Sequence, residues 1–385
     1  MLYIPPSLKI LQLEVRLLIP NFLICKLQMK KHLLNLFLSL IITTVYGQHK
    51  AVDKVLDSYI KKRNFNGVVL IAKNGKPDYL KYTGIANRHY NIAFTPKTRF
   101  QIFSVTKTFT AVLIMQLYEQ GKLSLDSTIS AYYPEYKGEA SRKVTIRNLL
   151  TYSSGRYLKE MDHKFIPEAY DQNLWPVDTF INRYCSEKLI DTPGTKFNYS
   201  NGDFILLGRI IEKIYKQPFD AVLREKILIP LKMNNTNYWH HEDIVPNLDE
   251  GYYNKEGSVD SLVMPTYHYI DNHFSAGAMY STPQDLLIFD QAIFNHTLLK
   301  KATVDLMLTS YPKLGDVAFG FWVYPRKIGQ SNTIFAERQG AGYGNESNWV
   351  HLMDKGVTLI LLSNTETADL NKMRLDLLDA YLNYN

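Results

Sequence analysis

The stretch from Phe103 to Gly121, FSVTKTFTAVLIMQLYEQG, joins a polar quartet to a long apolar run and ends in a glycine. The apolar run predicts a buried helix, and a glycine directly after such a run is typical of a helix C-terminus. Ser104 and Lys107 stand three positions apart, so a helix places both side chains on one face. Serine becomes an effective nucleophile when a nearby base takes its proton, and a partly desolvated lysine can be that base. The quartet is therefore a candidate catalytic pair.

The Ser-x-x-Lys pattern is common, and two other segments of the chain match it. Ser58 and Lys61 fall in HKAVDKVLDSYIKK, whose apolar spacing predicts an amphipathic surface helix. Ser310 and Lys313 enclose Pro312 between a helix signal and a strand signal, which favours a loop. On its own, the remaining quartet could also be a helix cap beside a surface lysine, so its companions in the sequence must decide.

One companion is the loop PGTKFNYSN over residues 193–201, which precedes a predicted helix. Tyr199 can relay a proton if cationic neighbours lower its pKa from about 10. Asn201 offers an amide to a substrate carbonyl. Tyr-x-Asn recurs elsewhere in the chain, so the motif is weak alone. As alternatives, Tyr199 is an ordinary buried phenol and Asn201 only the N-cap of its helix.

Two further segments could complete a site for an anionic substrate. The predicted strand NTIFAERQG over residues 332–340 carries Arg338, a candidate substrate-binding cation. Gly340 on the same strand permits close approach of a ligand to the backbone. The polar turn LLTYSSG over residues 149–155 closes another predicted helix. A structural salt bridge is the alternative role for Arg338.

Taken together and in this order, these segments resemble the serine β-lactamase and penicillin-binding protein superfamily, specifically its class C-like branch. Ser-x-x-Lys is among the marks of these enzymes. The resemblance covers roughly residues 52–364 and is carried by FSVTKTFTA, QLYEQGKLSLDSTIS, IRNLLTYSSG, PGTKFNYSNGDFILLGRIIEKI, FSAGAMYSTPQDL and GVTLILLSN. The branch also contains D-alanyl-D-alanine carboxypeptidases, D-amino-acid peptidases and small-ester esterases.

The resemblance assigns a role to each candidate residue. It implies that Ser104 is the acylated nucleophile and that Lys107 eases the loss of its proton. Tyr199 matches the tyrosine that passes a proton to the leaving group, and Asn201 matches the amide that steadies the acyl substituent. The backbone N–H groups of Ser104 and Ala341 would form the oxyanion hole, which lowers a reaction barrier by a few kcal/mol.

Three positions depart from the family pattern. Arg338 stands where the family usually has Lys or His, although the following Gly340 is kept. Arginine keeps the positive charge and could hold a substrate carboxylate bidentately, but it cannot give up a proton as histidine can. Asn345 replaces the aromatic residue usual after Gly344, and Tyr152 replaces a histidine common in the second turn. These departures concern the substrate pocket more than the nucleophile.

The sequence predicts an α/β (α+β) fold in which an antiparallel sheet is flanked by helices. Two β-rich runs enclose Asn74-Gly75, a dipeptide that favours a tight hairpin. Strand signals return from about residue 317, whereas residues 104–310 are helical and loop-rich. One sheet built from residues 48–103 and 317–385, with an inserted mainly helical subdomain, is therefore expected. The resemblance implies the β-lactamase/transpeptidase-like version of this fold.

The N-terminal region has the features of a secretory signal peptide over residues 29–47. A basic start at Met29 precedes the apolar run LLNLFLSLIITTV, and the segment ends with small or apolar residues at Gly47. The run is shorter than the ~20 residues of a comfortable membrane span. A buried or membrane-anchoring helix is the alternative. Residues 1–28 are then an upstream mis-start or an extension, and the mature domain covers residues 48–385.

Composition excludes several classes of function. The chain of 385 residues is 46% hydrophobic and 21% charged, which is ordinary for a globular protein. Its net charge of +7 falls to about +3 without residues 1–47, and the absence of basic runs argues against a nucleic-acid partner. Cys185 would be the only cysteine of the mature chain, so no internal disulfide is expected. The histidines lack metal-binding spacing, and neither a metal nor another cofactor is predicted.

The residues and the resemblance together predict a secreted, periplasmic serine hydrolase that forms an acyl-enzyme on Ser104. Its partner would be a small molecule or a peptidoglycan-derived substrate: a D-alanyl peptide, a β-lactam, or a small ester or amide. The signal peptide would contact the membrane only during export. The alternative is a catalytically weak cell-wall-binding or sensor protein of the same fold.

Overall fold

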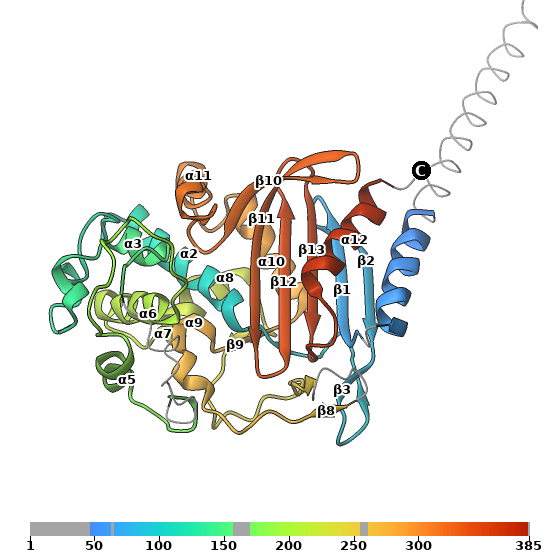
Figure 1. Cartoon of the computed structure of the whole chain (residues 1–385), viewed down its shortest axis with the longest axis horizontal. Helices are drawn as coiled ribbons and strands as arrows, with labels where there is room; N and C mark the ends of the chain where they lie inside the picture. Colours follow the sequence, from blue (N-terminus) through green and yellow to red (C-terminus); the bar gives the residue numbers. More distant parts are fainter. Residues whose placement is uncertain (1–46, 63–64, 157–169, 255–260, 384–385) are drawn as a thin grey trace, which may run out of the picture.

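The computed structural model describes residues 47–62, 65–156, 170–254 and 261–383. Its largest element is a six-stranded sheet in which all neighbouring strands are antiparallel (Figure 1). In spatial order, the strands are β10 (Trp322–Ile328), β11 (Ser331–Gly342), β12 (Asn345–Leu352), β13 (Val357–Ser363), β1 (Gly67–Lys73) and β2 (Lys76–Thr83). The sheet thus joins segments from both ends of the chain, and the predicted antiparallel sheet flanked by helices is confirmed.

The hairpin between β1 and β2 turns at the predicted dipeptide. Asn74 and Gly75 have φ angles of 49° and 74°, so both central residues are left-handed. A two-residue turn of this type matches the twist of the flanking strands, and asparagine and glycine are the residues that tolerate it best. The hairpin places β2 at the edge of the sheet and leaves the other side of β1 to pair with β13.

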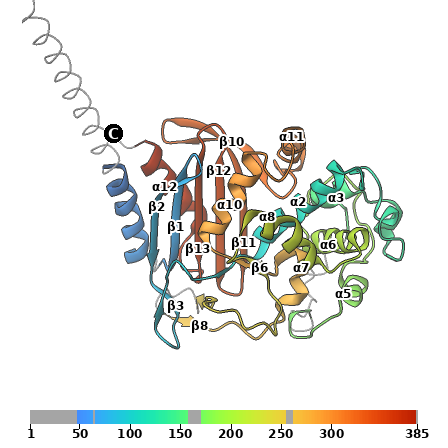
Figure 2. The same cartoon turned by 180° about the vertical axis from the view of Figure 1, so that it is seen from behind.

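Helices cover both faces of the sheet. Residues 47–62 are helical and, with α12 (Leu370–Leu382), lie on one face, whereas α10 (Pro283–Phe294) crosses the other (Figures 1 and 2). Successive side chains of β1 alternate between the two cores, with Val68 facing α10 and Val69 facing the terminal helices. Since neither face meets water, β1 and β13 are apolar at nearly every position.

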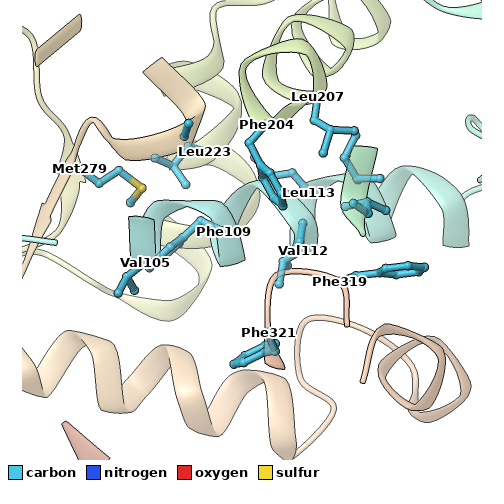
Figure 3. Close-up of a cluster of buried hydrophobic side chains, with 14 of the residues drawn as sticks. Val105, Phe109, Val112, Leu113, Phe204, Leu207, Leu223, Met279, Phe319 and Phe321 are labelled. Atoms are coloured by element: carbon cyan, nitrogen blue, oxygen red, sulfur yellow. The ribbon is translucent and has the colours of Figure 1, made fainter. Parts of the chain in front are cut away.

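The helical part of the molecule is organised around α2 (Thr106–Glu119), which is buried along almost its whole length. Figure 3 shows Phe109 and Val112 of α2 among side chains from α6 and from the segment before β10. This enclosure fixes the helix in place, and Gly121 ends it with a φ of 67°, as the sequence predicts. The first turn of α2 is therefore held by the protein core rather than by a flexible loop.

Several short elements complete the fold. Further α-helices in the described residues are α3 (Ile146–Leu150), α5 (Val177–Tyr184), α6 (Asn201–Tyr215), α7 (Phe219–Leu223), α8 (Ile229–Leu231), α9 (Phe274–Gly277) and α11 (Lys301–Met307). The short strands are β3 (Ile85–Asn87), β4 (Ile92–Ala93), β5 (Phe100–Gln101), β6 (Asn237–Tyr238), β7 (Tyr253–Asn254), β8 (Leu262–Val263) and β9 (Met279–Ser281). The small sheet β5-β9-β6 leads directly into the segment that carries Ser104.

The two rival Ser-x-x-Lys segments have the structures expected of them. Ser58 lies in the helix of residues 47–62, and Ser310 lies in a loop that leads into the single 3-10 turn Pro312–Leu314. Apart from Gly47, the predicted signal peptide falls outside the described residues, as does the segment 1–28. Across the described ranges, no helix combines the length and apolar character needed to cross a membrane.

Candidate active site

Ser104 lies in a single 3-10 turn, Phe103–Val105, directly before α2. Phe103 has a φ of 41°, a value rare for a bulky residue and often found where a fold holds a functional group in place. The residue before the first turn of α2 is Val105, and no side chain caps this helix end. Ser104 is therefore not a helix cap, and its side chain is partly accessible to solvent.

Lys107 is completely buried and directs its ammonium group at three oxygen atoms. Its Nζ donates to Ser104 Oγ at 2.9 Å, to Asn201 Oδ1 at 2.8 Å and to the Ala276 carbonyl at 2.7 Å. Three acceptors match the three protons of an ammonium group, and this pairing compensates for its burial. The arrangement supplies a fixed positive charge next to the Ser104 hydroxyl.

The Tyr199 hydroxyl also lies within hydrogen-bond distance of Ser104 Oγ, at 2.8 Å. Burial alone raises the pKa of Tyr199, but the charges of Lys107 and Arg338, with a hydrogen bond to Ser104, outweigh it and lower the pKa from 10.0 to about 7. A phenolate at this distance can accept the serine proton directly. Tyr199 is therefore placed to act as a base near neutral pH.

A buried ion pair supports the loop that carries Tyr199. Arg156 and Asp203 have side chains that are 1% and 0% exposed, and their charged atoms lie 2.7 Å apart. Arg156 also donates to Ser200 Oγ at 2.9 Å, while Ser200 caps α6 by accepting from the Asp203 backbone. Ser200, and not Asn201, is thus the N-cap, and Asn201 begins the helix with its amide oxygen on Lys107.

Arg338 has surroundings that differ from those the sequence predicts. Its side chain is 0% exposed and is enclosed by protein groups. Its Nε donates to the Ser104 carbonyl at 2.7 Å, Nη1 to the Tyr152 hydroxyl at 2.9 Å and Nη2 to the Tyr199 hydroxyl at 3.0 Å. The guanidinium carbon also lies 5.0 Å from the centre of the Trp322 ring. Among the described residues, the acceptors of Arg338 are two phenols and a carbonyl, and no carboxylate pairs with it.

Gly340 explains why β11 can approach the nucleophile. A Cβ at this position would lie 2.2 Å from the Ile102 carbonyl oxygen and 2.9 Å from the Ser104 nitrogen. Only glycine allows this contact between backbones. The pairing of β10 with β11 ends at Glu337, so the part of β11 that carries Ala341 continues past the end of β10. The N–H groups of Ser104 and Ala341 belong to these adjacent segments, and their role as oxyanion donors stays a prediction.

Sequence reasoning missed a group of aromatic residues next to Phe103. The centre of the Phe103 ring lies 5.9 Å from that of Tyr343. His268 stacks on the Tyr343 ring, with the two ring centres 3.3 Å apart. The Tyr343 hydroxyl lies 3.3 Å from His273 Nε2. Burial lowers the pKa of His273 to about 3, so this histidine is neutral. Trp239 extends the group along a cavity of about 330 Å³. These residues are far apart in sequence, and no motif could have brought them together.

The structure also adds partners for the predicted residues. The Ala276 carbonyl lies in FSAGAMYSTPQDL, a segment that the sequence singled out without a role for this residue. Tyr152 lies in a second such segment, LLTYSSG, and Arg156 follows that segment directly. In the part of the chain that the structure describes, no group of three or more His, Cys, Asp or Glu side chains could hold a metal ion.

The arrangement can perform nucleophilic chemistry on a carbonyl carbon. Ser104 Oγ lies between a cation, Lys107, and a group of lowered pKa, Tyr199. The cation stabilises negative charge on the oxygen, while the phenolate can remove its proton. A nucleophile, a base and a positive charge thus converge on one atom.

Comparison with known proteins finds similar proteins over most of the chain. The curated teichoic acid D-alanine hydrolase of Staphylococcus aureus is 26% identical over 327 residues, covering 83% of this chain and 75% of that protein. The solved structure of FmtA from Staphylococcus aureus aligns with a TM-score of 0.72 at 23% identity, covering 88% of this chain and 90% of that one. A D-amino acid amidase from Ochrobactrum anthropi SV3 has a TM-score of 0.74 at 23% identity, with coverages of 88% and 99%.

The model of the beta-lactamase family matches residues 52–382, which include the nucleophile turn, the tyrosine loop and β11. This match spans nearly all of the described structure, from the first helix to α12. The chain belongs to the beta-lactamase family of serine hydrolases.

Proposed function

We propose that this protein is a secreted hydrolase that transfers the acyl group of D-alanyl esters, amides or related substrates to Ser104 and then to water. The observation that carries the proposal is the placement of Ser104 Oγ between Lys107 Nζ at 2.9 Å and the Tyr199 hydroxyl at 2.8 Å. No other Ser-x-x-Lys segment within the described residues has such partners on its serine.

The first half of the reaction forms the acyl-enzyme. Ser104 Oγ attacks the substrate carbonyl carbon while its proton passes to the Tyr199 phenolate. The negative charge that develops on the carbonyl oxygen is stabilised by the N–H groups of Ser104 and Ala341. The carbon–heteroatom bond then breaks, and the Tyr199 hydroxyl returns the proton to the departing alcohol or amine.

The second half repeats these steps with water as the nucleophile. Tyr199, again a phenolate, takes a proton from water as the water oxygen attacks the ester carbonyl. The ester bond to Ser104 breaks, and Tyr199 supplies the proton that restores the serine hydroxyl. Lys107 also donates to Asn201 Oδ1 and to the Ala276 carbonyl, which take no part in the reaction and hold the ammonium group beside Ser104 in both halves.

The relatives support a D-alanyl or D-amino-acyl substrate. One is named a teichoic acid D-alanine hydrolase and another a D-amino acid amidase. The signal-peptide features of residues 29–47 support export, which would place the enzyme beside cell-wall substrates of this chemistry. D-alanyl peptides and β-lactams are included as substrates for testing, and no nucleic-acid partner is proposed.

The test is covalent labelling of the mature protein, residues 48–385. Incubation with p-nitrophenyl acetate, D-alanine methyl ester or a fluorescent penicillin is followed by intact-mass analysis and peptide mapping. We expect an acyl adduct on Ser104 that disappears in Ser104→Ala and persists in the matched controls Ser58→Ala and Ser310→Ala. An adduct that survives Ser104→Ala would contradict the nucleophile. No adduct with any reagent on folded wild-type protein would instead favour a binding or sensor protein.

A further inference from the structure

The two main departures from the family pattern, Arg338 and Tyr152, are bonded to each other. Arg338 Nη1 donates to the Tyr152 hydroxyl at 2.9 Å, and both side chains are 0% exposed. Tyr152 has a φ of 50°, so the turn orients the phenol toward β11 at some conformational cost. Tyr152, in place of the usual histidine, and Arg338, in place of the usual lysine or histidine, are bonded to each other. The two departures from the family pattern are therefore coupled.

Tyr152 also completes the enclosure of the guanidinium group. Its ring stacks on Tyr199, with centroids 4.7 Å apart, and lies 6.1 Å from the ring of Trp322. Arg338 sits within this set of rings, 5.7 Å from the centre of Tyr199 and 5.0 Å from that of Trp322. Burial raises the pKa of Tyr152 well above 10, so this phenol stays neutral and accepts the arginine bond without forming a second anion.

A substrate carboxylate cannot reach a cation enclosed in this way. Bidentate recognition needs two N–H groups on one accessible edge of the guanidinium. Here each of the three nitrogens of Arg338 already donates to a protein oxygen, and the side chain exposes no surface. The Arg338 charge acts instead on Tyr199, whose oxygen lies 3.0 Å from Nη2.

We infer that Arg338 and Tyr152 form a positioning pair: Tyr152 holds the guanidinium group so that its charge acts on Tyr199 and does not contact the substrate. The site therefore selects acyl donors whose leaving group carries no carboxylate. Neutral esters and amides are then preferred to peptides that end in a free carboxylate. The inference deepens the proposed function and rests on it, because it concerns the same acylation of Ser104.

The first test uses wild-type protein and substrates that differ only in the leaving group's charge. D-alanyl-D-alanine is compared with D-alanyl-D-alaninamide, and the D-alanyl ester of lactic acid with that of lactamide. We expect kcat/KM of each free acid to be no greater than that of its amide. A direct ion pair would favour the free acid by about 10- to 100-fold, since hydrogen bonds to charged groups contribute about 1.5–3 kcal/mol. A free acid that reacts faster than its amide would overturn the inference.

The second test separates the charge of Arg338 from its packing. Arg338→Gln removes the charge, so the acid limb of the kcat/KM profile is expected to move to higher pH by at least about one unit. Arg338→Lys restores a positive charge and is expected to return the limb toward the wild-type position. Loss of packing alone would lower the rate without moving the limb. An unmoved limb in folded, active Arg338→Gln would overturn the assignment.

The two proposals fail in different ways. If no substrate of either pair acylates Ser104 in the wild type, the proposed function fails. If Ser104 is acylated but the free acids react faster, only the role of Arg338 and Tyr152 fails. Circular dichroism and thermal unfolding of each variant identify those that fold, and the wild-type comparison requires none of them.

Discussion

Replacing Arg156 by methionine should destabilise the protein strongly, although the residue does not touch Ser104. The change leaves Asp203 fully buried beside the start of α6 without its cation. Removing one member of a buried ion pair costs about 3–5 kcal/mol, because the remaining charge is neither solvated nor paired. The Arg156 bonds to Ser200 Oγ and to the Cys185 carbonyl, at 2.9 and 3.0 Å, are lost as well. The expected loss at pH 7 is therefore about 4 kcal/mol of unfolding free energy.

The loss should also depend on pH, with a sign that the burial of Asp203 determines. Burial raises the pKa of Asp203 and Arg156 opposes this, so removing Arg156 raises the folded-state pKa further. When a carboxyl group has a higher pKa in the folded state than in the unfolded state, it costs no stability at pH values below the unfolded-state pKa. The cost grows as the pH rises from there toward the folded-state pKa. The gap between variant and wild type should thus shrink as pH falls from 7 toward 4.

Urea unfolding followed by tryptophan fluorescence measures both effects. Arg156→Met is compared with Asp203→Asn and with the double variant, in which no unpaired charge remains. We expect the double variant to be more stable than Arg156→Met alone. The reasoning would be refuted if the unfolding free energy of Arg156→Met lay within about 1 kcal/mol of the wild-type value at pH 7. A loss of stability that does not change with pH would refute it as well.

Three further predictions can be checked directly. For wild-type protein and p-nitrophenyl acetate, kcat/KM should rise about tenfold between pH 6 and pH 8, because the pKa of Tyr199 is about 7; a flat profile would exclude this base. Gly340→Ala should reduce kcat about 10²- to 10³-fold, since its Cβ would meet the Ile102 carbonyl at 2.2 Å and push β11 from Ser104; near-wild-type turnover would contradict the close approach. When the protein is exported by a host that cleaves secretory signal peptides, N-terminal sequencing should show a mature chain that begins near Gln48. A retained leader would contradict the predicted signal peptide.

Local sequence signals predicted two backbone turns of the fold well. Asn74-Gly75 forms the expected hairpin and Gly121 the expected helix end, because both depend on φ angles that few residues tolerate. At the start of α10, where Ser281 and Thr282 are adjacent, Thr282 is the residue that caps the helix. Two adjacent hydroxyl residues can both serve as caps, and their tertiary contacts decide between them.

The environment of Arg338 could not have been read from the chain. Strand alternation places Arg338 and Gly340 on the same face of their strand. Whether the guanidinium then meets solvent or protein depends on Tyr152 and Trp322, which come from distant segments. Burial of a polar side chain is a tertiary property, and a single sequence carries no signal for it.

The pairing of β1 with β13 sets the order in which the protein can become active during its synthesis. Gly67 pairs with Ser363, so the central sheet cannot close until almost the whole chain has emerged from the ribosome. Ser104 emerges early, long before Gly340 and Arg338, which complete its surroundings. A nascent or truncated chain that ends before β11 therefore carries Ser104 without Arg338 and Gly340, and the surroundings of the serine are complete only once the last strands are in place.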